Sequence, residues 1–189
     1  MNGFINYAAW ALTGAAKLAR FDASGVSYFD VSIAGFWRSF WAAVIVAPFF
    51  GMLLILRHLD AGSAGVFLHH LAIEFLTYVI AWVLFPLVMV SVTRMLGCTQ
   101  HFISFVVAYN WCGVIQNGVY LPIAIFAHTG ALSPGTANGL GLVAIAWVLA
   151  FTFFVARTTL KLPAGTAFAI VVLDLVLGLI LDTVSNRFM

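Results

Sequence analysis

The sequence predicts an all-α fold: a polytopic bundle of five transmembrane helices, preceded by an amphipathic helix at the membrane interface. Of 189 residues, 64% are hydrophobic and 7% are charged, against roughly 45–50% and about 25% in soluble domains. So few charged side chains cannot coat a soluble domain, and much of the apolar surface has to face lipid. The apolar residues form long continuous runs, which favours helices over the short alternating strands of a barrel.

Residues 1–32 form the first of two predicted units, a cytoplasmic amphipathic helix and a linker. A helix over residues 1–21 would lie on the cytoplasmic leaflet through one apolar stripe. The alternative is that this stripe packs on the bundle or on a partner. The stripe consists of Phe4, Ala8, Ala11, Ala15 and Leu18. Residues 22–32, rich in Asp, Ser and Gly, are typical of a linker.

Residues 33–189 form the second unit, the five-helix transmembrane domain. A hydrocarbon core of about 30 Å needs roughly 20 helical residues, and five windows approach or exceed that length. The last two are short, close to the lower limit of about 17 residues. The windows are Phe36–Leu56, Val66–Val92, Phe102–Phe126, Leu140–Ala156 and Gly165–Leu181.

The basic residues orient these spans. One side of the predicted membrane has only Arg57 and Arg187. Because Lys and Arg gather on the cytoplasmic side, the N-terminus is expected in the cytoplasm and the C-terminus outside. The other side has Lys17, Arg20, Arg38, Arg94, Arg157 and Lys161.

Polar side chains within the spans are the candidate functional residues. The second span carries Glu74, the third carries Asn110, Gln116 and Asn117, and the fifth carries Asp174. Such groups are costly in hydrocarbon, and their depths match, so we expect spans two, three and five to meet around a polar seam. The seam either fixes helix packing through hydrogen bonds or serves as a path for a solute or proton.

Four histidines map to the outer side and form a second candidate cluster. They could bind a metal, or His70 and His128 could hold a haem. The alternative is that they hydrogen-bond to headgroups and loops. With no HExxH or CxxC motif present, we predict no metal and no cofactor. The histidines are His58, His69, His70 and His128.

Other function classes are disfavoured by what the sequence lacks. No GxSxG, phosphate-binding or zinc motif occurs, so no enzyme activity is predicted. The net charge is +2 and the basic residues are scattered, which argues against nucleic acid as a partner. Cys98 and Cys112 are expected to be free thiols.

Five short segments follow one another in an order that resembles a known family. They are Phe36–Ala43 (FWRSFWAA), Phe85–Val88 (FPLV), Ala108–Trp111 (AYNW), Ala156–Thr158 (ART) and the region around Asp174. Together they resemble small bacterial membrane proteins of the Yip-type family, over most of residues 33–181. The resemblance implies a five-pass bundle in the bacterial inner membrane with a cytoplasmic N-terminus. Eukaryotic members bind Rab-type GTPases through larger N-terminal regions than residues 1–32.

Three functions are compatible with these observations. The first expectation is a non-enzymatic inner-membrane accessory or organising subunit, which contacts lipids and other membrane proteins, or a second copy, through helix faces. The second is a small transporter or channel that uses the polar seam. The third is a haem- or quinone-binding subunit of a respiratory or photosynthetic complex.

The charge distribution gives a first test. A reporter enzyme that is active only outside the cytoplasm, fused to the C-terminus, is expected to be active, because the C-terminus lies on the side with fewer basic residues. The same reporter fused to the N-terminus should be inactive. An inactive C-terminal fusion that is stably expressed would contradict the predicted odd number of spans.

Overall fold

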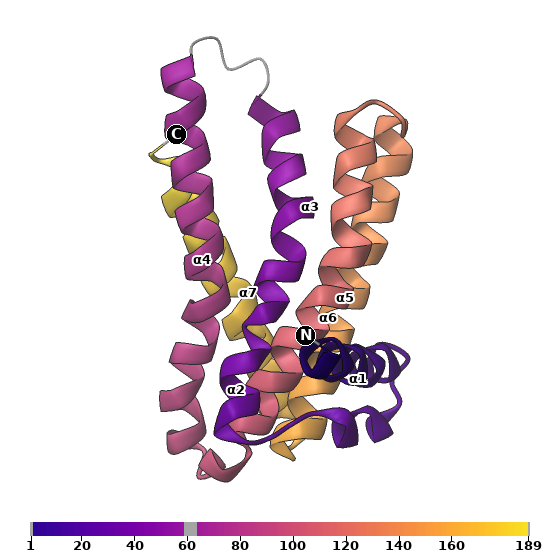
Figure 1. Ribbon diagram of the computed structural model, residues 1–189, viewed down its shortest axis with the longest axis vertical. Coiled ribbons are helices and arrows are strands. Elements are labelled where there is room, and N and C mark those ends of the chain that lie inside the picture. Colours follow the sequence, from indigo (N-terminus) through magenta and orange to yellow (C-terminus); the bar gives the residue numbers. More distant parts are fainter. Residues whose placement is uncertain (1, 59–63, 189) are drawn as a thin grey trace.

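The computed structural model describes residues 2–58 and 64–188, and this part of the chain contains helices and no strands. The long helices run alternately up and down, and α1 lies across the lower end of the bundle (Figure 1). The elements are α1 (Asn2–Ala19), η1 (Ala23–Tyr28), α2 (Ile33–Ser39), α3 (Trp41–His58), α4 (Ala64–Met95), η2 (Thr99–His101), α5 (Phe102–His128), α6 (Pro134–Leu160) and α7 (Ala164–Asn186).

Four segments are long and apolar enough to cross a membrane. They are Ile33–Arg57, Gly65–Met95, Pro134–Leu160 and Ala164–Asn186. The last two contain 27 and 23 residues, so the expectation that the corresponding windows are short is wrong. An N-cap explains the longer of the two. The Ser133 side chain accepts a hydrogen bond from the Thr136 amide, so α6 begins before the continuous apolar run that starts near Leu140.

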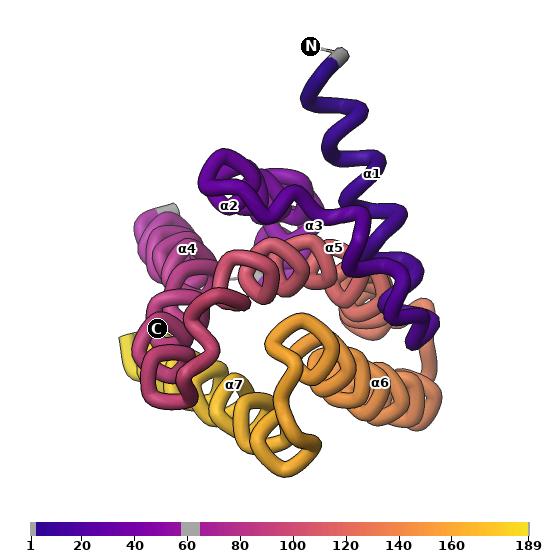
Figure 2. The backbone as a smooth tube through the Cα atoms, turned by 90° about the horizontal axis from the view of Figure 1, so that it is seen from below, coloured from indigo at the N-terminus to yellow at the C-terminus, as the bar shows by residue number. Residues whose placement is uncertain are grey.

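The remaining predicted span, 102–126, forms α5 but is not among these four segments. Its middle carries Asn110, Gln116 and Asn117, which lower its apolar character. These polar groups are accommodated because α5 packs against α1, α2, α3, α4 and α6. Figure 2 shows it between α2 and α3 on one side and α6 on the other. A fifth crossing by α5 stays a prediction.

The core of the bundle surrounds the first half of α5. Phe105, Trp111 and Asn110 are all completely buried there. The Asn110 amide donates a hydrogen bond of 2.8 Å to the hydroxyl of Ser39, at the end of α2. This bond satisfies the Asn110 NH₂ group, which would be costly to leave unpaired in an apolar interior, and joins α2 to α5; the Asn110 Oδ1 atom has no hydrogen-bond partner in the described residues.

The N-terminal unit packs on the bundle. Ala11, Ala15 and Leu18 of the predicted apolar stripe are buried, in the same cluster as Trp111 of α5. This part of the stripe therefore covers protein, and an interfacial role for α1 stays a prediction. Within the predicted linker, Ala23–Tyr28 forms the helix η1, which crosses α1 closely at Gly14.

Gly14 gives a test of this docking. A Cβ atom at this position would lie 2.7 Å from Tyr28 Cβ and 2.8 Å from the Gly25 carbonyl oxygen. Gly14→Ala is therefore expected to destabilise the protein by about 1–3 kcal/mol through overpacking, measured as a lower melting temperature in detergent. Gly3→Ala, where a Cβ meets no atom within 4 Å, is the control and should not lower it. An unchanged melting temperature for Gly14→Ala would contradict the packed N-terminal unit.

Candidate functional site

A polar pocket of about 420 Å³ lies between α3, α4, α5 and α7. Pockets of this size hold small molecules or parts of larger ones. Its walls combine charged, amide and hydroxyl groups with aromatic rings, within helices that are otherwise apolar. The polar lining residues are Arg57, Glu74, Thr77, Tyr78, Tyr109, Gln116, Asn117, Asp182 and Asn186.

Three charged side chains line the part of this polar pocket that lies farthest from α1. Arg57 comes from the last turns of α3, Glu74 from α4 and Asp182 from α7. Asp182 accepts a hydrogen bond of 3.2 Å from the Asn186 amide. In the described part of the chain, neither the Arg57 nor the Glu74 side chain has a hydrogen-bond or ion-pair partner within the protein. Both charges are thus available to a bound group.

The pocket is closed toward the end of the bundle that carries α1. Tyr109 lines the pocket and donates a hydrogen bond of 3.0 Å to the carboxylate of Asp174 on α7. The Phe85 ring lies 4.8 Å from the Tyr109 ring, measured between centroids. Phe85 and Phe105 are buried in the core cluster behind it. The pocket extends toward the opposite end, where Arg57 and Asn186 line it from the last turns of α3 and α7.

The structure brings three of the five predicted seam residues to this pocket: Glu74, Gln116 and Asn117. Gln116 also donates a hydrogen bond of 3.0 Å to Thr152 of α6. The Asn117 amide donates to the Gly113 carbonyl oxygen of its own helix, at 2.8 Å. Asp174 does not line the pocket, but Tyr109 connects it to the pocket wall.

Asn110, the fifth seam residue, lies outside the pocket and bonds to Ser39 of α2. Asn117 lies seven residues after Asn110, close to two helical turns, so both side chains lie on the face of α5 that packs against α2 and α3. Asn110 stabilises the packing of α2 on α5. Asn117 lies farther along, where α3 and α5 leave space between them.

The histidines form separate links between helix ends. The ring of His128 lies 2.8 Å from the Leu56 carbonyl oxygen of α3, and that of His69 lies 3.0 Å from the Phe188 carbonyl oxygen. The His70 ring lies 6.2 Å from the His69 ring, and the side chain of His58 lies outside the described residues. Within residues 2–58 and 64–188, no group of three or more His, Cys, Asp or Glu is placed to hold a metal.

Sequence reasoning missed part of this pocket. From the sequence, Arg57 serves only to orient the spans, and Asp182 lies one residue past the predicted fifth span. A predicted fifth span that extended to the observed end of α7 would have included Asp182 and Asn186. The sequence did not mark Thr77 and Tyr109 as pocket residues, because hydroxyl groups are common in membrane helices.

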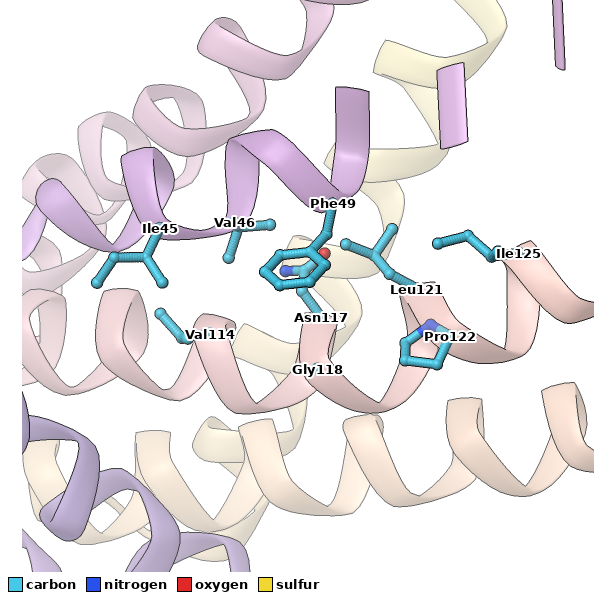
Figure 3. A pocket seen from close by; sticks show the side chains of 9 residues that line it. All are labelled: Ile45, Val46, Phe49, Val114, Asn117, Gly118, Leu121, Pro122 and Ile125. Carbon is cyan, nitrogen blue, oxygen red and sulfur yellow. The ribbon is translucent and has the colours of Figure 1, made fainter. Parts of the chain in front are cut away.

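Largely apolar grooves flank the polar pocket, and two of them lie beside α3. The first, of about 230 Å³, lies between α3 and α5, and Figure 3 shows Asn117 among its otherwise apolar lining side chains. The second, of about 450 Å³, lies between α3 and α4 and shares Phe50 and Tyr78 with the polar pocket. The rings of Phe50 and Tyr78 stack at 4.7 Å between centroids. Both rings line the polar pocket as well as this groove, so the two spaces adjoin at this pair.

No protein-family model matches the chain, and no curated protein or solved structure matches it. The resemblance to the Yip-type family stays a prediction from the sequence. Only the geometry of the pocket and its grooves therefore bears on function.

The pocket's access to water can be tested with cysteine labelling. Glu74→Cys is expected to react with a membrane-impermeant maleimide, because Glu74 lines a polar pocket of about 420 Å³ that has room for water and a thiol needs water to ionise. Leu76→Cys is the control, since Leu76 lies about 3 Å farther along α4 on an exposed apolar side; it should react slowly.

The native thiols give a low background in this assay. Cys98 and Cys112 are both buried, and burial raises the pKa of the Cys98 thiol above its ordinary value. Equal labelling rates for Glu74→Cys and Leu76→Cys would contradict an aqueous pocket.

Proposed function

We propose that this chain is a non-enzymatic, multi-pass membrane protein that binds or transports a small molecule through the polar pocket between α3, α4, α5 and α7. The observation that carries the proposal is the unpartnered Glu74 on a pocket of about 420 Å³, with the unpartnered and exposed Arg57 at the end of its span on the same pocket, in the described part of the chain. Glu74 lies within the apolar segment Gly65–Met95, and charged groups at membrane depth are costly and mark substrate or ion paths.

The polar groups that only stabilise packing provide a contrast. Asn110 bonds to Ser39 and Thr77 to Ser185, each joining one helix to another. Interhelical hydrogen bonds of this kind account for packing without any ligand. Arg57 and Glu74 make no such bonds in the described residues, so a packing role does not explain them.

The accessory-subunit function, our first expectation from the sequence, has less support. It would rely on exposed apolar faces of helices such as α4 and α7. Those faces suit lipid chains as well as another membrane protein. The polar pocket is the feature that bulk lipid does not explain.

We also propose that the pocket opens on the non-cytoplasmic side of an inner membrane. Lys17, Arg20 and Arg38 lie in or next to α1 and α2, and Arg94, Arg157 and Lys161 lie at the ends of α4 and α6. These elements meet at the lower end of the bundle (Figure 1). Basic residues favour the cytoplasmic side, and Arg57, Asp182 and Asn186 line the pocket toward the opposite end.

A pocket-filling variant tests the proposal. Gly178 lines the pocket, and a Cβ added there meets no atom within 4 Å, so Gly178→Leu should fill the pocket without disturbing the fold. Native mass spectrometry of protein purified gently from its own membrane is expected to show a bound low-mass component in the wild type. Gly178→Leu should lose it.

Gly165→Leu is the matched control, because Gly165 lies on the same helix in open space and outside the pocket. This variant should keep the component. If the wild type carries no low-mass component, or if Gly178→Leu keeps it, the binding function is wrong. A stoichiometric protein complex without such a component would instead support the accessory-subunit function.

A further inference from the structure

From the adjoining polar and apolar spaces beside α3, we infer that the ligand is an amphiphile: a zwitterionic phospholipid whose headgroup occupies the polar pocket and whose hydrocarbon chain lies in the groove between α3 and α4. This inference rests on the proposed function and names its ligand class. It starts from the two residues, Phe50 and Tyr78, that line both spaces.

The groove has the chemistry of a hydrocarbon chain. Apart from Tyr78 its lining is apolar, and Tyr78 points its hydroxyl away to the Ala43 carbonyl oxygen, at 2.6 Å. Its walls are Ala47, Phe50, Gly51, Leu54, Leu68, Leu71, Ala72, Phe75 and Tyr78.

The length of the groove fits one membrane leaflet. Along α4 it extends from Leu68 to Tyr78, which corresponds to about 15 Å of helix. Half of a hydrocarbon core of about 30 Å is about 15 Å. The groove also lies in the half of the bundle away from α1, beside the pocket, so a chain from the leaflet on that side can enter it sideways.

The charges of the polar pocket fit a zwitterionic headgroup. Arg57 is placed to bind a phosphate, to which a guanidinium can donate two parallel hydrogen bonds. Glu74 and Asp182 line the same pocket and supply two carboxylates for an ammonium group. An anionic headgroup would leave both carboxylates without a counter-charge, whereas a phosphoethanolamine headgroup offers a partner to all three charges.

The other apolar groove beside α3 serves as a comparison within the same protein. The groove between α3 and α5 is smaller, about 230 Å³ against about 450 Å³, and shares only Asn117 with the polar pocket. Gly51 lines the α3–α4 groove and Gly118 lines the α3–α5 groove. A Cβ at either glycine meets no atom within 4 Å, so a leucine can fill each groove separately.

The test uses the purified full chain in nanodiscs that contain equal amounts of phosphatidylethanolamine and phosphatidylglycerol, and counts retained lipid by native mass spectrometry after detergent transfer. Wild-type protein is expected to retain phosphatidylethanolamine in preference to phosphatidylglycerol. Gly51→Leu and Gly178→Leu should each lose this retention, and Gly118→Leu should keep it. Melting temperatures check that all three variants fold.

Glu74→Gln tests the headgroup contact without changing the shape of the pocket. The loss of a charge-assisted contact is expected to weaken the retention of phosphatidylethanolamine by about tenfold, and phosphatidylglycerol should be affected less. Soluble phosphoethanolamine at the same concentration should not displace the lipid, because it lacks the chain.

The outcomes separate the two proposals. If Gly178→Leu loses a bound component that has no hydrocarbon chain, and Gly51→Leu keeps it, the pocket binds a soluble solute and the phospholipid inference is wrong. If the wild type retains neither lipid nor any other low-mass component, both the phospholipid inference and the proposed function are wrong. Equal retention of both lipids, or loss of retention in Gly118→Leu alone, also overturns the inference.

Discussion

The hydrogen bond between Asn110 and Ser39, buried where α5 meets α2, is the constraint on which the rest of the structure depends. Asn110 is completely buried, and its amide donates to Ser39 at 2.8 Å. A helix with amides in its middle is poorly suited to face lipid. The bundle accommodates α5 by surrounding it with other helices, and the N-terminal unit packs on the same core.

The position of the pocket follows from this arrangement. At the level of Asn110 the interior is filled with aromatic and aliphatic side chains, among them Phe105 and Trp111. Farther from α1, the small residues Gly113 and Gly178 line the polar pocket. One end of the bundle is therefore filled with side chains, and the other contains a polar pocket and apolar grooves.

Arg57 and Glu74 set the chemistry of that space. Packing accounts for most of the polar groups in the bundle, since Gln116, Thr77 and Tyr109 each hydrogen-bond to a neighbouring helix. The two charges lack such partners in the described residues and lie beside an α3–α4 groove of apolar side chains. Polar and apolar walls that share Phe50 and Tyr78 suit an amphiphile better than a simple ion.

The sequence by itself determined that the chain is helical and that most of its long helices suit a membrane, because composition and continuous apolar runs depend on no partner. It also identified Glu74, Gln116 and Asn117, since polar groups stand out against apolar helices. Only the tertiary structure decided that Asn110 bonds to α2 while Asn117 lies at the pocket, and that Arg57 and Asp182 join it. Those outcomes depend on which helices are neighbours, and helix neighbours are set by long-range packing that a local pattern does not contain.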